Sequence, residues 1–549
     1  MSSNPIINTL TRVGIAAAGL LAPAVAFAQE AAETTAAAPE AAATINSGDT
    51  AWMLTSTVLV LFMILPGLAL FYGGLVRSKN MLSVLMQCLV VSAAIMIVWV
   101  VYGYSLAFTN GGGLNTFVGG FEKLFLAGVT PDSVSGSIPE YVFIAFQMTF
   151  ACITPALIVG AFAERIKFSA VMLFCILWVT FVYFPMAHMV WSGDGALMWD
   201  WGAIDFAGGT VVHINAGIAG LVGAIMVGKR TGFGKDMMAP HSMTLTMVGA
   251  SMLWVGWYGF NAGSAAAANG VAGLAMINTF TATAGAVVAW CVIETVSRGK
   301  ASMLGAASGV IAGLVAVTPA AGAVGPIGAI FLGAIASALC YFFVSVVKNK
   351  FGYDDTADVF GVHGVGGIVG AIGSGIFAAT SLGGVGYAEG ITMGAQVWIQ
   401  IKSVIVTILW CGIGETAKIV IVFIGAFIPI VLNTSAGIRA IDPLLISAGK
   451  VLGANKRQLL MDVAFPATIP AILAGIKTAL SSGWMCVVAA EMIVAKQGVG
   501  FLIVRGQEIG DTALIVVCML AIGIVSALLS MILTKLEGVL CPWQFSKIK

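Results

Sequence analysis

The sequence predicts an all-α, polytopic membrane protein with eleven transmembrane helices in an inverted five-plus-five repeat, followed by about three extra apolar helices. Three observations predict this fold class. Hydrophobic residues make up 59% of the 549 residues, and charged residues make up only 9%. Apolar runs of about 20 residues, the length that crosses a bilayer as a helix, recur along the chain. Two histidines, His213 and His363, also stand in matching apolar frames.

The first residues have the pattern of a secretory signal. Residues 1–28 combine Arg12, an apolar stretch and the small-residue cleavage site Ala26-Phe27-Ala28. Residues 29–47 are rich in Ala, Glu, Thr and Pro and predict a disordered outer tail. Cleavage of the signal would leave the mature N-terminus on the periplasmic side of a bacterial inner membrane.

The eleven expected spans alternate in the charge of the loops that follow them. Basic residues follow the first, third, fifth, seventh and ninth spans, whereas the other loops hold mainly acidic residues. The positive-inside rule then places the basic loops in the cytoplasm, which agrees with an outer N-terminus. The expected spans are 50–76, 81–109, 139–162, 168–190, 207–228, 241–260, 271–296, 303–318, 324–347, 356–378 and 393–414.

The histidine frames repeat one design. The first runs from Asp205 to His213 and the second from Asp358 to His363, and each is followed by a Gly-(Leu/Ile)-Val-Gly-Ala-Ile stretch. The histidines fall on the fifth and tenth spans, so the halves have five helices each and the second half is inverted. Such repeats place their site near the bilayer midplane. Ionisable groups at that depth usually mark a pathway for substrate or protons, and the alternative is two satisfied core histidines.

The acidic residues of the frames have two interpretations. Asp205 either assists the capture of a cation or caps the fifth helix, and Asp358 has the same capping alternative at the tenth helix. His188 and His241 lack the repeated frame and are expected to be structural.

Aromatic residues gather near the outer ends of the spans. Aromatic faces attract cations by about 0.5–2 kcal/mol each, and a serine hydroxyl accepts a hydrogen bond from an N–H group. The set therefore suits a small ammonium-like cation, although each ring alone also fits an interface belt or ordinary packing. Desolvation keeps the deeper histidines neutral, so a neutral amine would cross far more easily than a bare cation. The residues are Phe146, Phe150, Trp191, Trp257, Phe260 and Ser264.

A series of motifs runs in order through the first 413 residues: FYGGLVRSKN, AFQMTFACIT, GAFAERIKFSA, AHMVW, DFAGGTVVHINAGIAGLVGA, GWYGFNAGSA, DVFGVHGVGGIVG and SLGGVGYAEG. With these motifs, residues 48–413 closely resemble the ammonium transporter (Amt/Rh-type) family. The resemblance implies ammonium or ammonia as the transported molecule and a homotrimer with one pore per subunit, surrounded by membrane lipid. Its implied site has Phe150 and Phe260 as the external gate, His213 and His363 as the pore histidines, Trp257 as a pore neighbour, and Phe146, Phe150, Trp191, Ser264 and Asp205 at the recruitment site.

The pattern of this family stops after about Gly414, so its cytoplasmic tail, which serves gating and regulation, is absent. A cytosolic nitrogen-signalling regulator would therefore lack the segment it acts on. The expected organisation is a signal peptide at 1–28, an outer tail at 29–47, a transporter domain at 48–414 and a different segment at 415–549.

A second resemblance begins at GIGETAKIV. Residues 412–549 look like the C-terminal part of an ABC importer permease of the nitrate/sulfonate/taurine type, with Gly453, Pro466 and Pro470 at the marker positions of a coupling loop, 439–466. In that family the short helix around 444–452 docks into a separate ATPase, and the alternative is an amphipathic surface loop. The chain carries no GxxxxGK[ST] motif, so an ATP site would lie on a partner. We interpret the sequence as a chimera, made by gene fusion or by an assembly error.

The two resemblances conflict in topology. The eleventh span is expected to end inside near residue 414, and another apolar run, 417–436, follows it. One more crossing would place Arg439 and the other cations of the coupling loop outside, against the charge rule. Either span eleven does not insert fully, or 417–436 lies along or re-enters the membrane, or the last segment is frustrated.

Ammonium transport or channel activity is the leading hypothesis. The alternatives are an ABC permease subunit for nitrate, sulfonate or taurine that acts with an ATPase, and an ammonium sensor. No nucleophile–base set, metal cluster, cofactor loop or nucleic-acid module stands out. We therefore expect no catalytic residues, no cofactor, no metal and no nucleic-acid partner. The nine cysteines form no CxxC pair and are expected to pack as small hydrophobes.

Overall fold

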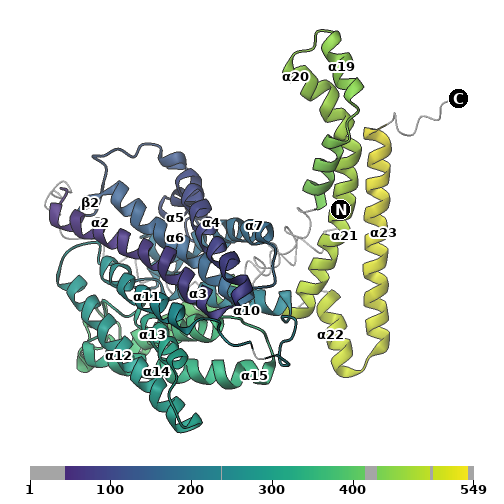
Figure 1. Cartoon of the computed structure of the whole chain (residues 1–549). Coiled ribbons are helices and arrows are strands. Elements are labelled where there is room, and N and C mark those ends of the chain that lie inside the picture. The colour runs from purple at the N-terminus through teal and green to yellow at the C-terminus, as the bar shows by residue number, and fades with distance from the viewer. Residues whose placement is uncertain (1–43, 237, 414–428, 495–498, 542–549) are drawn as a thin grey trace, which may run out of the picture. The chain divides into compact units, whose positions relative to one another are not determined.

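The computed structural model describes residues 44–236, 238–413, 429–494 and 499–541, and helices make up most of these ranges (Figure 1). Within them the strands are β1 (Val134–Ser135) and β2 (Ile138–Pro139), which form one antiparallel pair. The expected signal peptide and residues 29–43 of the expected tail lie outside the described residues. Asn46 already caps the first described helix, since its side chain accepts a hydrogen bond from the Asp49 amide.

Eleven helical segments follow the expected spans, several of them interrupted by a π-helical turn. The first six comprise α2 (Ser47–Phe62), η1 (Met63–Leu68) and α3 (Ala69–Leu75); α4 (Met81–Val98), η3 (Trp99–Gly103) and α5 (Tyr104–Phe108); α6 (Glu140–Phe162); α7 (Phe168–Trp178), η6 (Val179–Tyr183) and α8 (Phe184–Trp191); η7 (Gly209–Ile214) and α10 (Asn215–Val227); and α11 (Met243–Gly263). The last five comprise α12 (Gly270–Arg298); α13 (Met303–Val317); α14 (Pro326–Phe342), η8 (Phe343–Val347) and α15 (Lys348–Phe351); η9 (Phe360–Gly364) and α16 (Val365–Phe377); and α17 (Met393–Ile408) with η11 (Leu409–Ile413).

Length and composition support the membrane assignment. In the described ranges, 11 helices are long and apolar enough to cross a membrane, and two of these, Lys456–Leu480 and Thr512–Gly538, belong to the C-terminal segment. The others correspond to expected spans, and α11 and the shorter apolar α13 complete the predicted set. The prediction of a polytopic helical membrane protein is confirmed.

The two histidine helices cross at glycine. A Cβ on Gly217 would lie 2.3 Å from the Gly364 Cα, and a Cβ on Gly367 would lie 3.1 Å from the Gly209 carbonyl oxygen. Gly217 and Gly367 each follow their histidine by four positions. In the structure, Gly217 therefore corresponds to Gly367. The repeated sequence stretch instead aligned Gly367 with Gly220, the first residue of Gly-Leu-Val-Gly-Ala-Ile. The approach is reciprocal, because α10 contacts η9 and α16 contacts η7.

The eleventh expected span corresponds to α17 and η11, which pack beside the pore helix. Gln400 still hydrogen-bonds Ile204, which precedes the pore helix η7. Eleven positions later, the Cys411 thiol lies 2.6 Å from the Asn215 side-chain oxygen, and Asn215 is two residues past His213. Cys411 thus lies beside the pore helix, close to the histidines. The expected span 393–414 agrees with the described helix, which runs from Met393 to Ile413.

The C-terminal segment is helical as well. It contains α19 (Pro443–Val451), α20 (Lys456–Gln458), η12 (Leu459–Ala464), α21 (Phe465–Val494), α22 (Val499–Ile509) and α23 (Thr512–Leu540). Asp442 caps α19, and Asn455 and Gln458 form a capping box on α20. Helices α21 and α23 run side by side and are joined by an ion pair between Lys477 and Glu537 (Figure 1). Most of the expected apolar run 417–436 lies outside the described residues.

We predict that Gly217→Ala destabilises the protein, because its new methyl group would overlap the backbone of Gly364. Overpacking of this kind costs about 1–3 kcal/mol. Thermal unfolding of the detergent-solubilised protein, followed by size-exclusion chromatography, measures the effect. Gly273→Ala is the matched control, since a Cβ added at this position of α12 would meet nothing within 4 Å. Equal midpoints for both variants would contradict the close crossing.

Candidate functional site

An outer cavity of about 160 Å³ lies near the beginning of the pore helix η7. Four residues singled out from the sequence line it together: Phe146, Phe150, Trp191 and Ser264. The ring centroids of Phe146 and Phe150 are 5.0 Å apart, and the ring of Trp191 meets that of Phe150 edge-on at 5.8 Å. The remaining lining residues, which sequence reasoning missed, are Phe108, Phe143, Gln147, Phe206 and Ala266. A spacing of three and seven from Phe143 to Phe146 and Phe150 on α6 was the available signal.

Two polar groups of the outer cavity, those of Ser264 and Trp191, have their hydrogens engaged. The Ser264 hydroxyl donates to the Phe260 carbonyl at 2.8 Å, and Trp191 Nε1 donates to the Asp205 carbonyl at 2.9 Å. The serine oxygen therefore keeps its capacity to accept a hydrogen bond from a ligand. Aromatic faces and a free acceptor favour a cation with N–H groups over an anion.

A column of rings leads inward from this cavity. Phe150 and Phe260 stack with centroids 4.1 Å apart and planes 14° apart. The centroid of His213 lies 6.0 Å from that of Phe260 and 5.3 Å from that of Trp257. Trp257 is fixed from behind, since its Nε1 donates to Thr318 Oγ1 at 2.9 Å. No pattern in the sequence pointed to Thr318.

The column ends in the two histidines. Their ring centroids are 5.4 Å apart, and the two Nδ1 atoms are 3.3 Å apart. His213 is completely buried and His363 nearly so. A hydrogen bond between two Nδ1 atoms requires a proton on one of them and a lone pair on the other. In the described part of the chain, His213 Nε2 is buried and has no hydrogen-bond partner.

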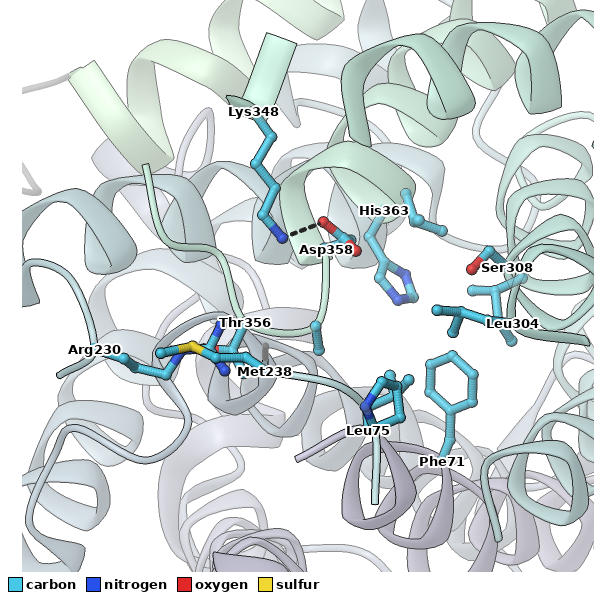
Figure 2. A pocket seen from close by; sticks show the side chains of 14 residues that line it. Phe71, Leu75, Arg230, Met238, Leu304, Ser308, Lys348, Thr356, Asp358 and His363 are labelled. Atoms are coloured by element: carbon cyan, nitrogen blue, oxygen red, sulfur yellow. Dashed lines mark hydrogen bonds and ion pairs between the residues drawn. The ribbon is translucent and has the colours of Figure 1, made fainter. Parts of the chain in front are cut away.

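An inner cavity of about 190 Å³ begins on the far side of the pair, where His363 points into it (Figure 2). Its walls mix apolar and charged side chains, and Lys348 Nζ pairs with Asp358 Oδ1 at 2.7 Å. From the sequence, Arg230 and Lys348 were assigned only to cytoplasmic loops. The lining residues are Phe71, Leu75, Arg230, Met238, Pro240, Leu304, Ser308, Ile311, Lys348, Thr356, Ala357, Asp358, Val362 and His363.

The start of each histidine helix is capped by a buried carboxylate. Asp205 accepts hydrogen bonds from the amides of Gly208, Gly209, Thr210 and Val211. Burial raises the pKa of this carboxyl, and the hydrogen bonds from Thr210 and its neighbours oppose that rise. The Asp205 carboxylate is thus a helix cap, and the Asp205 backbone carbonyl accepts a hydrogen bond from Trp191.

The cap of the second frame is Asp355, not Asp358. Asp355 accepts from the amides of Val359 and Phe360 at 3.0 and 2.8 Å, and burial raises its pKa to about 6. Both caps precede their histidines by eight positions, a match that the sequence contained and that we overlooked. Asp358 has a left-handed φ of 56° and faces Lys348. The interpretation of Asp358 as the helix cap was therefore wrong.

A buried ion network fixes the loops at the inner end. Arg230 meets both carboxylate oxygens of Asp354, its Nη2 at 2.8 Å, and Arg165 Nη1 lies 3.7 Å away. Burial alone would raise the pKa of Asp354, but hydrogen bonds from Arg230 outweigh it and the pKa is lowered. The network ties the chain before α7, after α10 and before η9.

The other expected residues lie elsewhere. The ring nitrogens of His188 lie 3.1 and 2.7 Å from the carbonyls of Ala107 and Asn115, and His241 Nδ1 lies 2.9 Å from that of Val76. In the C-terminal segment, Gly453 has a φ of 80° just after α19, and Pro466 and Pro470 lie in α21. All three markers follow α19, which is an exposed helix, since Leu444 is 74% and Val451 87% exposed.

The comparisons with known proteins agree with this geometry. The model of the Ammonium Transporter Family matches residues 51–437. The chain belongs to this family. It is 51% identical over 384 residues to the ammonium transporter of Aquifex aeolicus, covering 69% of this chain and 88% of that protein. It is 47% identical over 394 residues to the ammonium transporter of Bacillus subtilis, covering 70% of this chain and 94% of that protein.

Solved structures give the same result for the fold of this transporter. The crystal structure of Candida albicans Mep2 matches with a TM-score of 0.61 and 33% identity, covering 67% of this chain and 82% of that one. A second family model, the binding-protein-dependent transport system inner membrane component, matches residues 371–543. The two matches support the interpretation as a chimera. The transporter match also extends past residue 413, where we had expected it to end.

The capping assignment gives a direct prediction for this transporter. Asp355→Ala should lower the thermal unfolding midpoint, because losing a cap costs about 0.5–2 kcal/mol and leaves buried amides unpaired. Asp358→Asn should cost less, since Asn tolerates a positive φ and keeps a side-chain oxygen that Lys348 can bind. Differential scanning fluorimetry of the two purified variants measures the order. A larger loss for Asp358→Asn would contradict the assignment.

Proposed function

We propose that this chain transports ammonium by capturing the cation in the outer cavity and conducting ammonia past the histidine pair. The observation that carries the proposal is the unbroken series of ring contacts from Phe150 through Phe260 and His213 to His363. The series links an outer cavity suited to a cation with an inner cavity that contains charged groups.

Capture depends on the outer cavity. Rings of Phe146, Phe150 and Trp191 surround a space of about 160 Å³, and each contributes about 0.5–2 kcal/mol to the binding of a cation. The Ser264 oxygen accepts one N–H of the ion. The Asp205 backbone carbonyl binds Trp191 directly, and the Asp205 carboxylate acts on the site through the helix start that it caps.

Passage depends on the ring column. A bare cation that enters a dry, apolar channel loses its hydration, and the rings of Phe150 and Phe260 do not replace it. A neutral molecule avoids most of this penalty. His213 Nε2 offers a buried polar atom at the depth where a small amine has no water to bind. The molecule that passes the ring column is therefore ammonia, with or without separate transfer of the proton.

The surroundings follow from the family. We propose a homotrimer in the bacterial inner membrane, with the signal peptide removed and the outer cavity facing the periplasm. Apolar side chains on α12 and α14, such as Val292 and Phe331, are more than half exposed in the single chain and are available to lipid or to a second subunit.

The match of residues 371–543 favours a second candidate function for the C-terminal segment, that of an ABC permease fragment coupled to a separate ATPase. We propose that its coupling loop, 439–466, faces the cytoplasm. The cations of the loop carry this orientation. Arg439, Lys450, Lys456 and Arg457 then lie on the side that the charge rule requires.

Capture of the cation affects the half-saturation concentration for transport, whereas passage through the pore affects the maximal rate. Trp191→Leu should raise the half-saturation concentration for methylammonium about fivefold, because one cation–π face of about 1 kcal/mol is lost. His213→Leu should lower the maximal rate about tenfold or more, because a buried hydrogen-bonding atom is removed from the path. Uptake by cells that express equal amounts of each variant measures both. Phe121→Ala, in an exposed outer loop, is the control. Unchanged uptake by both variants would refute the proposal.

Orientation is tested separately by thiol labelling. Leu452→Cys, which is 87% exposed, should react with a membrane-impermeant maleimide in inside-out vesicles and not in intact spheroplasts. Leu114→Cys, in the outer loop, should show the opposite pattern. Of the cysteines whose side chains the structure describes, only Cys291 is not buried, and the unsubstituted protein measures the background labelling. Labelling of Leu452→Cys from the outside would place the coupling loop in the periplasm.

A further inference from the structure

Lys402 is a cation in the middle of an apolar helix. It lies in α17, on the face that carries Trp398, Ile405 and Leu409, and each of these three is more than 40% exposed. Such a stripe faces lipid in a membrane protein. In the described part of the chain, no carboxylate lies within ion-pair distance of Lys402. A lysine without a carboxylate partner keeps N–H donors for an anion from outside the chain.

The contact that Lys402 does make is with an aromatic ring. Its Nζ lies 4.4 Å from the centroid of Trp201, in the loop after α9 (Leu197–Asp200). The loop is clamped to α17: Gln396 Nε2 donates to the Gly202 carbonyl at 2.9 Å, and Gln400 exchanges hydrogen bonds of 2.8 and 2.7 Å with Ile204. The ring is thus held in place over the ammonium group before any ligand arrives.

The depth of this pair fits a lipid headgroup. Lys402 contacts Trp201 in the loop that precedes the pore helix. Its ammonium group therefore lies toward the membrane surface at which α17 begins. A lysine stem that runs along apolar surface and ends at the interface is the usual arrangement at a headgroup. One face of the ammonium group meets the ring, and its other N–H donors remain available to an anion.

The nearby carboxylates are already engaged elsewhere. Asp200 accepts a hydrogen bond from the Gly195 amide, and Asp194 accepts one from Trp199 Nε1. The Lys402 ammonium group lies between exposed apolar side chains. An anion that fits both features is the phosphate of a lipid headgroup.

We propose that Lys402 and Trp201 form a binding site for the phosphate of an anionic phospholipid, whose acyl chains lie along Trp398 and Ile405. The leaflet is the outer one, a detail that rests on the proposed orientation of the transporter. The lipid would brace α17 against the loop that leads to Asp205, and through it the start of the pore helix.

Lipid binding by the full-length protein in detergent, measured with native mass spectrometry and thermal shift, tests this site. Phosphatidylglycerol should bind the wild-type protein and Lys402→Arg, whereas Lys402→Met should lose about tenfold in affinity. Trp201→Leu should give an intermediate loss. Lys300→Met, an exposed lysine in a cytoplasmic loop, is the matched control and should bind as the wild type does.

Three binding results would overturn the proposal, as would one change of assembly. These are equal binding of phosphatidylglycerol by Lys402→Met and the wild type, equal binding of phosphatidylcholine and phosphatidylglycerol by the wild type, and equal protection by inorganic phosphate. A change of oligomeric state in Lys402→Met would assign the lysine to a subunit contact and would also overturn it. Because these measurements use no transport, their failure leaves the proposed function untouched.

Discussion

The contact between two buried imidazole rings is the constraint on which the rest of the structure depends. His213 and His363 bring their Nδ1 atoms to 3.3 Å, so a hydrogen bond between them requires a proton on one ring and a lone pair on the other. That contact requires two helices to cross with backbone against backbone, which Gly217 and Gly364 permit. It also requires each helix to begin at a fixed height, which the buried carboxylates of Asp205 and Asp355 determine by binding its first amides.

The same constraint explains how the two ends of the pore differ from its middle. Phe150, Phe260 and Trp257 surround the outer side of the pair with apolar surface, whereas charged groups return only beyond His363, where Lys348 and Asp358 line the inner cavity. Under the proposed function, selection for a cation and passage of a neutral molecule would therefore take place at different points along one path.

Much of this was readable from the sequence. Apolar runs and basic loops predicted the eleven spans, and the repeated frame singled out both histidines, because period and charge are local properties of the chain. Other features were missed because they depend on tertiary contacts. Asp358 was chosen over Asp355 although Asp355 has the better spacing, since only the structure shows which carboxylate meets the helix amides. Thr318 has no pattern of its own, and only the structure shows that Cys411 lies beside Asn215.

The central claim is that an uncharged corridor conducts a molecule that has given up its proton. Potassium tests it most directly, because this ion resembles ammonium in size and charge but has no proton to release. In proteoliposomes with the purified wild-type protein and an inward gradient of each ion, we predict measurable ammonium uptake and no potassium flux above that of empty liposomes. Potassium flux comparable to ammonium uptake would contradict the claim, since a bare cation would then cross the ring column.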